Sequence, residues 1–221
     1  MNTTLQTAFD REFNLITDEL MDMGRQVVSA IELSMTSLNE ANAKLAKKIV
    51  EEDQKINDLR FKIEEDCVAL IATQQPAARD LRAVIAAMHI VVELERIGDH
   101  VKGIAKTVLL MKHEPLLKTL KKIFKMGELS QKMLSQALEA FIKRDSQWAN
   151  EIAAMDPEMD ALYKAVFDKL IEVMAEEPDL VVRGTYLLWT AHNLERIADR
   201  VTNIAEHIIF MTTGDLRELK Y

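Results

Sequence analysis

Hydrophobic residues recur every three or four positions along the first part of the chain. The series is Phe9, Phe13, Ile16, Leu20, Met23, Val27, Ile31 and Leu38. This spacing forms one apolar stripe along an α-helix, which we predict over residues 4–39. A second stripe predicts a helix over residues 42–73. That helix ends near Gln75 because the residue before a proline avoids helical dihedral angles.

The same pattern continues through the rest of the chain. It predicts four further helices, over residues 79–112, 116–143, 146–175 and 179–214. Short connections between long helices make sequence neighbours pack side by side. We therefore expect an all-α protein made of two tandem antiparallel three-helix bundles, with a boundary near Pro115 that separates residues 1–114 from residues 115–221.

The third and sixth predicted helices are similar in sequence. Leu-Glu-Arg-Ile-Gly-Asp at residues 94–99 aligns with Leu-Glu-Arg-Ile-Ala-Asp at residues 194–199, at a constant offset of 100 positions. A repeat in constant register indicates a duplicated structural unit. The two bundles should therefore be related to each other as copies.

Each repeat carries acidic or amide side chains spaced four residues apart on two of its helices. The candidate metal ligands are Asp53, Asn57, Glu95, Asp99, Asp156, Asp160, Glu195, Asp199 and Asn203. Residues four apart share one side of a helix. Oxygen donors from two facing helices suit a hard or borderline metal ion. These residues also have a simpler interpretation as solvated acids on an outer surface, with Arg96 and Arg196 as their counter-charges.

The two repeats differ at positions that matter for metal binding. Asn57 stands where the second repeat has Asp160, and Gly103 stands where it has Asn203. Lys106 replaces an acidic residue and would repel a cation. We therefore expect the second bundle to hold metal better than the first. Pro157, inside the fifth predicted helix, either kinks that helix or begins a new turn, and both outcomes re-aim the neighbouring acid.

The charge and the cysteine content narrow the function further. The formal net charge is -8, which repels a nucleic-acid backbone. Cys67 is the only cysteine, so no internal disulfide forms, and no secretory signal is recognisable at the start. The longest nearly apolar stretch, residues 83–92, is too short to span a membrane. We expect a cytoplasmic protein whose contact with the inner membrane is peripheral and made through partners.

The repeated signature resembles the PhoU family of phosphate-specific transport system accessory proteins. The resemblance rests on Glu-Arg-Ile-Gly/Ala-Asp at residues 95–99 and 195–199, on the acids of the preceding helices, and on Gln-Pro-Ala-Ala-Arg-Asp-Leu-Arg at residues 75–82. It covers essentially the whole chain. It implies a pair of three-helix bundles, often as a homodimer, whose acidic motifs hold multinuclear iron or zinc clusters at the surface in some members.

The resemblance also implies a function. PhoU-like proteins are expected to be negative regulators of phosphate uptake and of the phosphate-starvation response. They would act as adaptors between the ATPase subunit of the phosphate ABC transporter and a phosphate-sensing histidine kinase. No catalytic motif is present in the sequence, so we do not expect an enzyme. The alternatives are a metal-storage or metal-dependent helical bundle and a metal-free helical scaffold.

Overall fold

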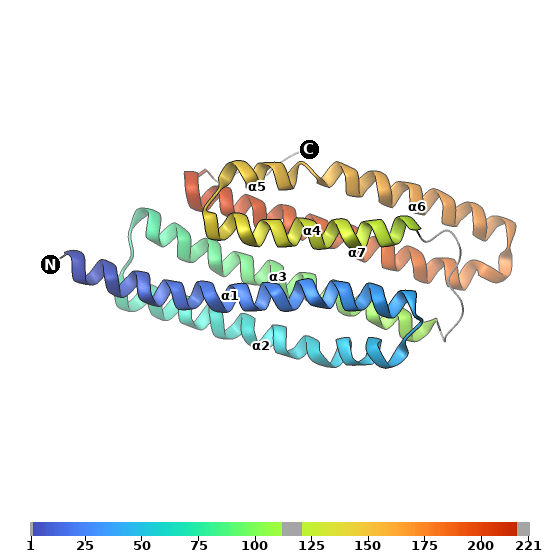
Figure 1. The fold of residues 1–221 in the computed structure, drawn as a ribbon, viewed down its shortest axis with the longest axis horizontal. Coiled ribbons are helices and arrows are strands. Elements are labelled where there is room, and N and C mark those ends of the chain that lie inside the picture. Colours follow the sequence, from blue (N-terminus) through green and yellow to red (C-terminus); the bar gives the residue numbers. More distant parts are fainter. Residues whose placement is uncertain (1, 112–120, 216–221) are drawn as a thin grey trace.

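The computed structural model describes residues 2–111 and 121–215, and Figure 1 shows them as a bundle of long helices. The first bundle contains α1 (Asn2–Asn39), α2 (Ala43–Gln74) and α3 (Ala78–Leu110). These bounds agree with the predicted helices to within a few residues. The predicted boundary between residues 114 and 115 lies outside the described residues, as does the predicted start of the fourth helix at Leu116.

The ends of α2 show why its bounds could be predicted. The side chain of Asn42 accepts a hydrogen bond from the backbone N–H of Leu45 at 3.0 Å, which caps the start of the helix. At the other end Gln75 adopts a left-handed conformation with φ 47°. Pro76 follows it, so the helix cannot continue.

The second bundle contains five elements. They are α4 (Lys121–Lys143), α5 (Ser146–Ala153), α6 (Asp156–Glu176), the short 3-10 helix η2 (Pro178–Leu180) and α7 (Val181–Thr213). The prediction of a single helix over residues 146–175 is therefore wrong, because the chain breaks at residues 154–155. Pro157 lies in the first turn of α6, where its missing N–H has no helical partner to lose. Pro157 thus begins a new helix and makes Asp156 the first residue of that helix.

The two bundles share one continuous hydrophobic core. Its centre is the crossing of α3 and α7, which lie side by side between the other helices in Figure 1. The two helices run antiparallel: the ring of His89 stacks on the ring of His207 at one end, and His100 contacts Asn193 farther along. Ile97 is fully buried near the middle of this crossing. The repeated signature therefore brings the two bundles together, while its acids point to the flanking helices.

Two further features follow from the fold. The single cysteine, Cys67, is fully buried on α2, and burial raises the pKa of its thiol to about 12. Among the described helices, none has an apolar stretch long enough to cross a lipid bilayer.

Candidate functional site

The first acidic cluster lies between α2 and α3, and a lysine closes it. Asp53 is only 4% exposed, and Lys102 Nζ donates a hydrogen bond to Asp53 Oδ2 at 2.6 Å. This bond raises the pKa of Lys102, so the ammonium stays charged. Lys102 was not among the predicted site residues. It lies seven positions after Glu95, on the same side of α3, and this spacing is the signal that could have identified it.

Two arginines neutralise the rest of the first cluster. Arg60 Nη1 lies 3.9 Å from Glu95 Oε1, and Arg96 Nε lies 3.7 Å from Glu95 Oε2. Arg60 also pairs with Glu64, its neighbour one turn along α2, at 3.3 Å. Burial and the nearby Asp99 raise the pKa of Glu95, and the two arginines oppose that rise. The first cluster therefore already contains its cations.

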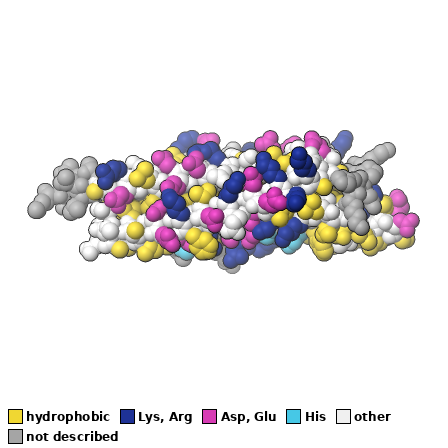
Figure 2. Space-filling view, turned by 90° about the horizontal axis from the view of Figure 1, so that it is seen from below, with side chains coloured by type: hydrophobic (Ala, Val, Ile, Leu, Met, Phe, Trp, Pro, Cys, Tyr) yellow, Lys and Arg dark blue, Asp and Glu magenta, His cyan; other side chains and the backbone are white. Residues whose placement is uncertain are grey.

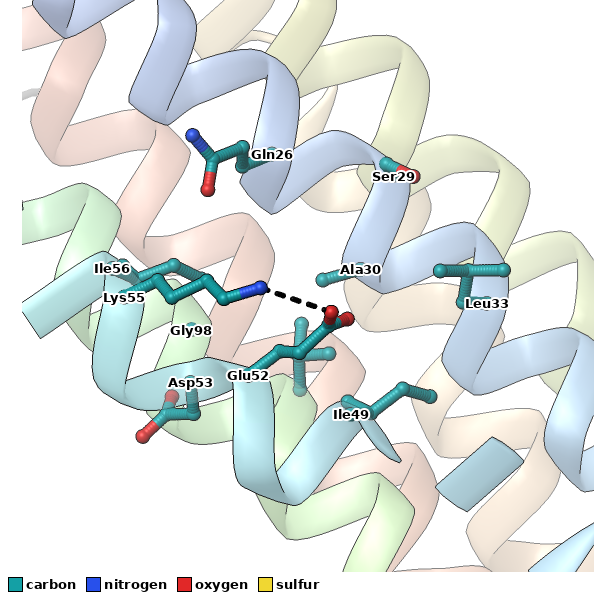
Figure 3. A pocket seen from close by; sticks show the side chains of 11 residues that line it. Gln26, Ser29, Ala30, Leu33, Ile49, Glu52, Asp53, Lys55, Ile56 and Gly98 are labelled. Atoms are coloured by element: carbon teal, nitrogen blue, oxygen red, sulfur yellow. Dashed lines mark hydrogen bonds and ion pairs between the residues drawn. The ribbon is translucent and has the colours of Figure 1, made fainter. Parts of the chain in front are cut away.

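A cavity of about 240 Å³ lies beside the first cluster, between α1 and α2. Figure 3 shows Glu52 and Lys55 of α2 joined by an ion pair there, with Gln26 and Ser29 of α1 on the opposite wall. The carboxylate of Asp53 points away from that ion pair, toward Lys102. The charged groups that line this cavity are already paired, Glu52 with Lys55 and Asp53 with Lys102.

The second acidic cluster lies between α6 and α7 and has fewer counter-charges. Burial first, and the neighbouring carboxylates second, raise the pKa of Asp156 and the pKa of Glu195 to about 6 each. Asp160 and Asp199 are the neighbours that contribute to both shifts. The second repeat has Thr202 where the first has Lys102, and its hydroxyl bonds only to the carbonyl of Ala198 on its own helix. Among residues 2–111 and 121–215, no lysine forms an ion pair with this cluster.

Arg196 and His192 on α7 contact the carboxylates of the second cluster. Arg196 forms an ion pair with Asp199. His192 Nδ1 lies 3.5 Å from Glu195 Oε2, an oxygen that has no hydrogen-bond partner. Burial and the neighbouring carboxylates therefore outweigh the guanidinium of Arg196, and the pKa values of Asp156 and Glu195 stay raised.

Asn203 lies apart from the carboxylates with which it was predicted. Its amide donates a hydrogen bond to Glu93 Oε2 at 3.2 Å, and Arg200 Nη1 lies 3.5 Å from the same oxygen. Glu93 is on α3, so Asn203 takes part in the contact between the bundles. Its four-residue spacing from Asp199 predicted a place beside the acids. Its side chain instead faces α3, where it bonds to Glu93.

The predicted ligands offer the oxygen atoms that a metal ion needs, but they are not arranged around a common point. In residues 2–111 and 121–215, no three Asp, Glu, His or Cys side chains converge closely enough to hold a metal ion. Several buried oxygens nevertheless lack a hydrogen-bond donor, namely Asp53 Oδ1, Asn57 Oδ1, Glu95 Oε2 and Glu195 Oε2. Such acceptors are costly to bury unpaired. In the second cluster a bound cation would supply the missing partner once the side chains turned toward it.

Comparison with known proteins matches this duplicated architecture. The family model of the PhoU domain matches residues 20–108 and again residues 123–208. A phosphate-specific transport system accessory protein PhoU homolog of Clostridium acetobutylicum is 34% identical over 207 residues, which cover 93% of this chain and 94% of the relative. A homolog of Streptococcus pneumoniae with the same description is 34% identical over 215 residues, covering 97% of this chain and all of the relative.

Solved structures confirm the all-α fold of two tandem three-helix bundles. The crystal structure of the phosphate transport system regulatory protein PhoU from S. pneumoniae superposes with a TM-score of 0.90 at 33% identity, covering 96% of this chain and 100% of that one. The crystal structure of PhoU from Pseudomonas aeruginosa gives the same TM-score and identity and covers 94% of this chain and 100% of that one. The chain, with its two matched domains and its full-length likeness to these proteins, belongs to the PhoU family.

Proposed function

We propose that this protein is a regulatory accessory protein of a phosphate transport system and that it works by contacting other proteins. The observation that carries the proposal is the full-length identity of 34% to relatives described as phosphate-specific transport accessory proteins. The finer role is that of a cytoplasmic adaptor. It binds the ATPase subunit of the phosphate ABC transporter and a phosphate-sensing histidine kinase, and it lowers both phosphate uptake and the starvation response.

The shape of the molecule suits an adaptor. At 1.5 Å per residue, the 38 residues of α1 extend over about 57 Å. The continuous core between the bundles joins α1 to the helices of the second bundle. Such a body can place two partners at fixed positions. The thiol of Cys67 is buried and its pKa is raised, so it is a poor nucleophile.

Gene deletion with complementation tests the regulatory role. In the host grown in phosphate-rich medium, deletion should raise phosphate uptake and switch on a phosphate-starvation reporter, and the wild-type gene should restore both to the parental level. The purified protein should also retain the ATPase subunit of the transporter in a pull-down experiment. Uptake and reporter levels that do not change on deletion would contradict negative regulation.

Metal binding is an accessory part of the proposal and concerns the second cluster. Asp156, Asp160, Glu195 and Asp199 supply the oxygen donors, and the raised pKa values of Asp156 and Glu195 reflect carboxylates that a cation would stabilise. Iron or zinc bound there would neutralise the cluster and hold α6 against α7. The first cluster has Lys102 and two arginines in that position and should bind metal more weakly.

Elemental analysis tests the metal site with a matched pair of variants. The protein is purified without chelator or affinity-tag metal, reconstituted with iron or zinc, and analysed by mass spectrometry. Glu195→Gln/Asp199→Asn should lose most of the bound metal, whereas Glu95→Gln/Asp99→Asn, at the equivalent positions of the first repeat, should keep it. Equal metal contents in the wild type and both variants would contradict a site in the second cluster.

A further inference from the structure

The outer face of α6 and α7 carries large apolar side chains that contact solvent. Trp189 is 52% exposed, Phe167 42%, Ile171 46% and Val182 63%. Together with Tyr163 they form what we call the aromatic strip. Single exposed hydrophobic residues are ordinary, but a group of them on one face is typical of an interaction site.

The aromatic strip is continuous with the second acidic cluster. The ring of Tyr163 on α6 lies 6.3 Å from the ring of Phe167 and 6.3 Å from the ring of His192 on α7. His192 in turn contacts Glu195. On α6, Asp156, Asp160, Tyr163, Phe167 and Ile171 follow at steps of three and four and so share one side of the helix. The face is therefore acidic at one end and aromatic at the other.

The equivalent face of the first repeat has a different character. Arg60 and Glu64 stand where the second repeat has Tyr163 and Phe167, and they form an ion pair. Figure 2 shows acidic and basic side chains alternating along the side of the molecule that carries α2. Phe61 is exposed there, but the guanidinium of Arg60 lies over its ring at 5.0 Å. Within the part of the chain that the structure describes, the second repeat alone combines acids that have few counter-charges with an exposed aromatic surface.

Charge decides what can cover this face. A second copy of the chain would bring the same carboxylates against it, and an anionic membrane or a nucleic acid would also be repelled. A partner segment with lysine or arginine at one end and large aliphatic residues at the other would match both halves. Aromatic residues are also the usual energetic centre of protein interfaces.

We propose that the α6–α7 face is the docking surface for a basic amphipathic helix of the transporter's ATPase subunit. Lysine or arginine side chains of that helix pair with Asp156 and Asp160, and its aliphatic side chains cover Phe167 and Trp189. This assignment rests on the proposed regulatory function, since it names the surface through which that function is exerted. It gives the second repeat the partner contact and leaves the first repeat a structural role.

The binding experiment compares matched variants of the full-length protein, treated with EDTA so that metal does not mask the carboxylates. Affinity for the purified ATPase subunit is measured for the wild type, for Phe167→Ser/Trp189→Ser, and for the control Phe61→Ser/Val68→Ser on α2. Loss of two central aromatic contacts should weaken binding at least about tenfold. The control should change affinity less than about threefold. All four side chains are exposed, so circular dichroism should show unchanged helical content.

Salt dependence and cross-linking test the chemistry of the partner. Wild-type binding should weaken several-fold between low and high salt, and Asp160→Asn should reduce that dependence. A photo-cross-linking residue at position 167 should attach to a peptide of the ATPase subunit that contains lysine or arginine next to aliphatic residues, and one at position 61 should not. A cross-linked peptide without basic residues would overturn the proposal.

The outcomes distinguish this inference from the function on which it rests. A wild type that fails to bind the ATPase subunit would overturn the proposed function itself. A wild type that binds, with Phe167→Ser/Trp189→Ser binding equally well, would overturn only the docking surface. Wild-type self-association, or wild-type binding to anionic vesicles, that is lost in the same double variant would assign the strip to another occupant and also overturn it.

Discussion

The two acidic clusters occupy equivalent positions in the two repeats, but different side chains balance their negative charge. In the first, Lys102 bonds to the buried Asp53, and Arg60 and Arg96 flank Glu95. In the second, the equivalent of Lys102 is Thr202, and burial together with the neighbouring carboxylates raises the pKa values of Asp156 and Glu195. Burial of like charges is unfavourable unless a cation is supplied. The first repeat supplies a lysine and two arginines from its own sequence, whereas the ion pair that reaches the second cluster comes from Arg196.

The same contrast extends one turn along the helices. The ion pair of Arg60 with Glu64 occupies the place of the aromatic pair Tyr163 with Phe167. At these equivalent positions the first repeat therefore has paired charges, and the second has aromatic rings. This difference is the reason why the proposed partner contact is assigned to the second repeat.

The largest effect should come from removing the internal cation of the first cluster. Lys102→Met keeps the apolar stem but leaves the carboxylate of Asp53, 4% exposed, without its 2.6 Å partner. Breaking a buried pair by removing one member is strongly unfavourable. Because Lys102 itself is partly exposed, we expect a loss of about 2 kcal/mol in the free energy of unfolding. Urea titration followed by circular dichroism measures it.

The control is the equivalent position of the second repeat. Thr202→Val removes only a bond to the carbonyl of Ala198 within the same helix and should change stability by less than about 0.5 kcal/mol. Adding Asp53→Asn to Lys102→Met should recover part of the loss, because no charge then remains buried. Equal losses for Lys102→Met and Thr202→Val would mean that the two clusters are not compensated differently.

Periodicity predicted most of the fold because the helices are long and their apolar stripes are regular. The stripe of α1 and the capped ends of α2 depend on local residues, which the sequence displays directly. Pro157 left two local outcomes open, since a proline either kinks a helix or opens one. The choice was made by packing: Ile152 and Ala153 at the end of α5 and Met159 early in α6 are all fully buried, on either side of the break.

The candidate site was less predictable because it depends on contacts between helices. Spacing of four brought the acids of α6 and α7 together as expected, but it also included Asn203, which turns to Glu93 on α3. Lys102 entered the first cluster from the expected helix face without being predicted. The number of counter-charges that reach each cluster is set by tertiary packing, and this number, more than the acids themselves, makes the two repeats different.

The second prediction concerns the pH dependence of stability and tests the second acidic cluster. The pKa of Glu195 rises from 4.5 in the unfolded chain to about 6 in the folded protein. The folded state then binds more protons between these values, so stability falls as pH rises from about 4.5 to about 6, and above 6 the cost stays constant. Allowing for its partial exposure, Glu195→Gln should stabilise the metal-free protein at pH 7 by about 1 kcal/mol.

The measurement is the difference in unfolding free energy between Glu195→Gln and the wild type, in EDTA, at several pH values. The difference should be largest at pH 7 and should vanish near pH 4.5. Using the difference cancels the opposite trend from His207, whose pKa is lowered to about 4 by burial and by His89. A variant less stable than the wild type at pH 7 would show that the second cluster is already compensated.

The smallest expected effect concerns the one position at which the two signatures differ, Gly98 in the first repeat and Ala198 in the second. Both residues are fully or nearly buried in helices. A Cβ on Gly98 would lie 3.4 Å from Ile56 and 3.5 Å from Asp53 Oδ1, which is ordinary contact distance. Alanine also restricts the unfolded chain more than glycine does.

Gly98→Ala should therefore stabilise the protein by about 0.5 kcal/mol, and Ala198→Gly should destabilise it by about 1 kcal/mol. If Gly98→Ala instead destabilises the protein in urea titration, the methyl group disturbs the pairing of Asp53 with Lys102. Gly98 would then be needed to leave room for the ion pair of Asp53 with Lys102. The second repeat has no equivalent ion pair, so alanine is tolerated at position 198.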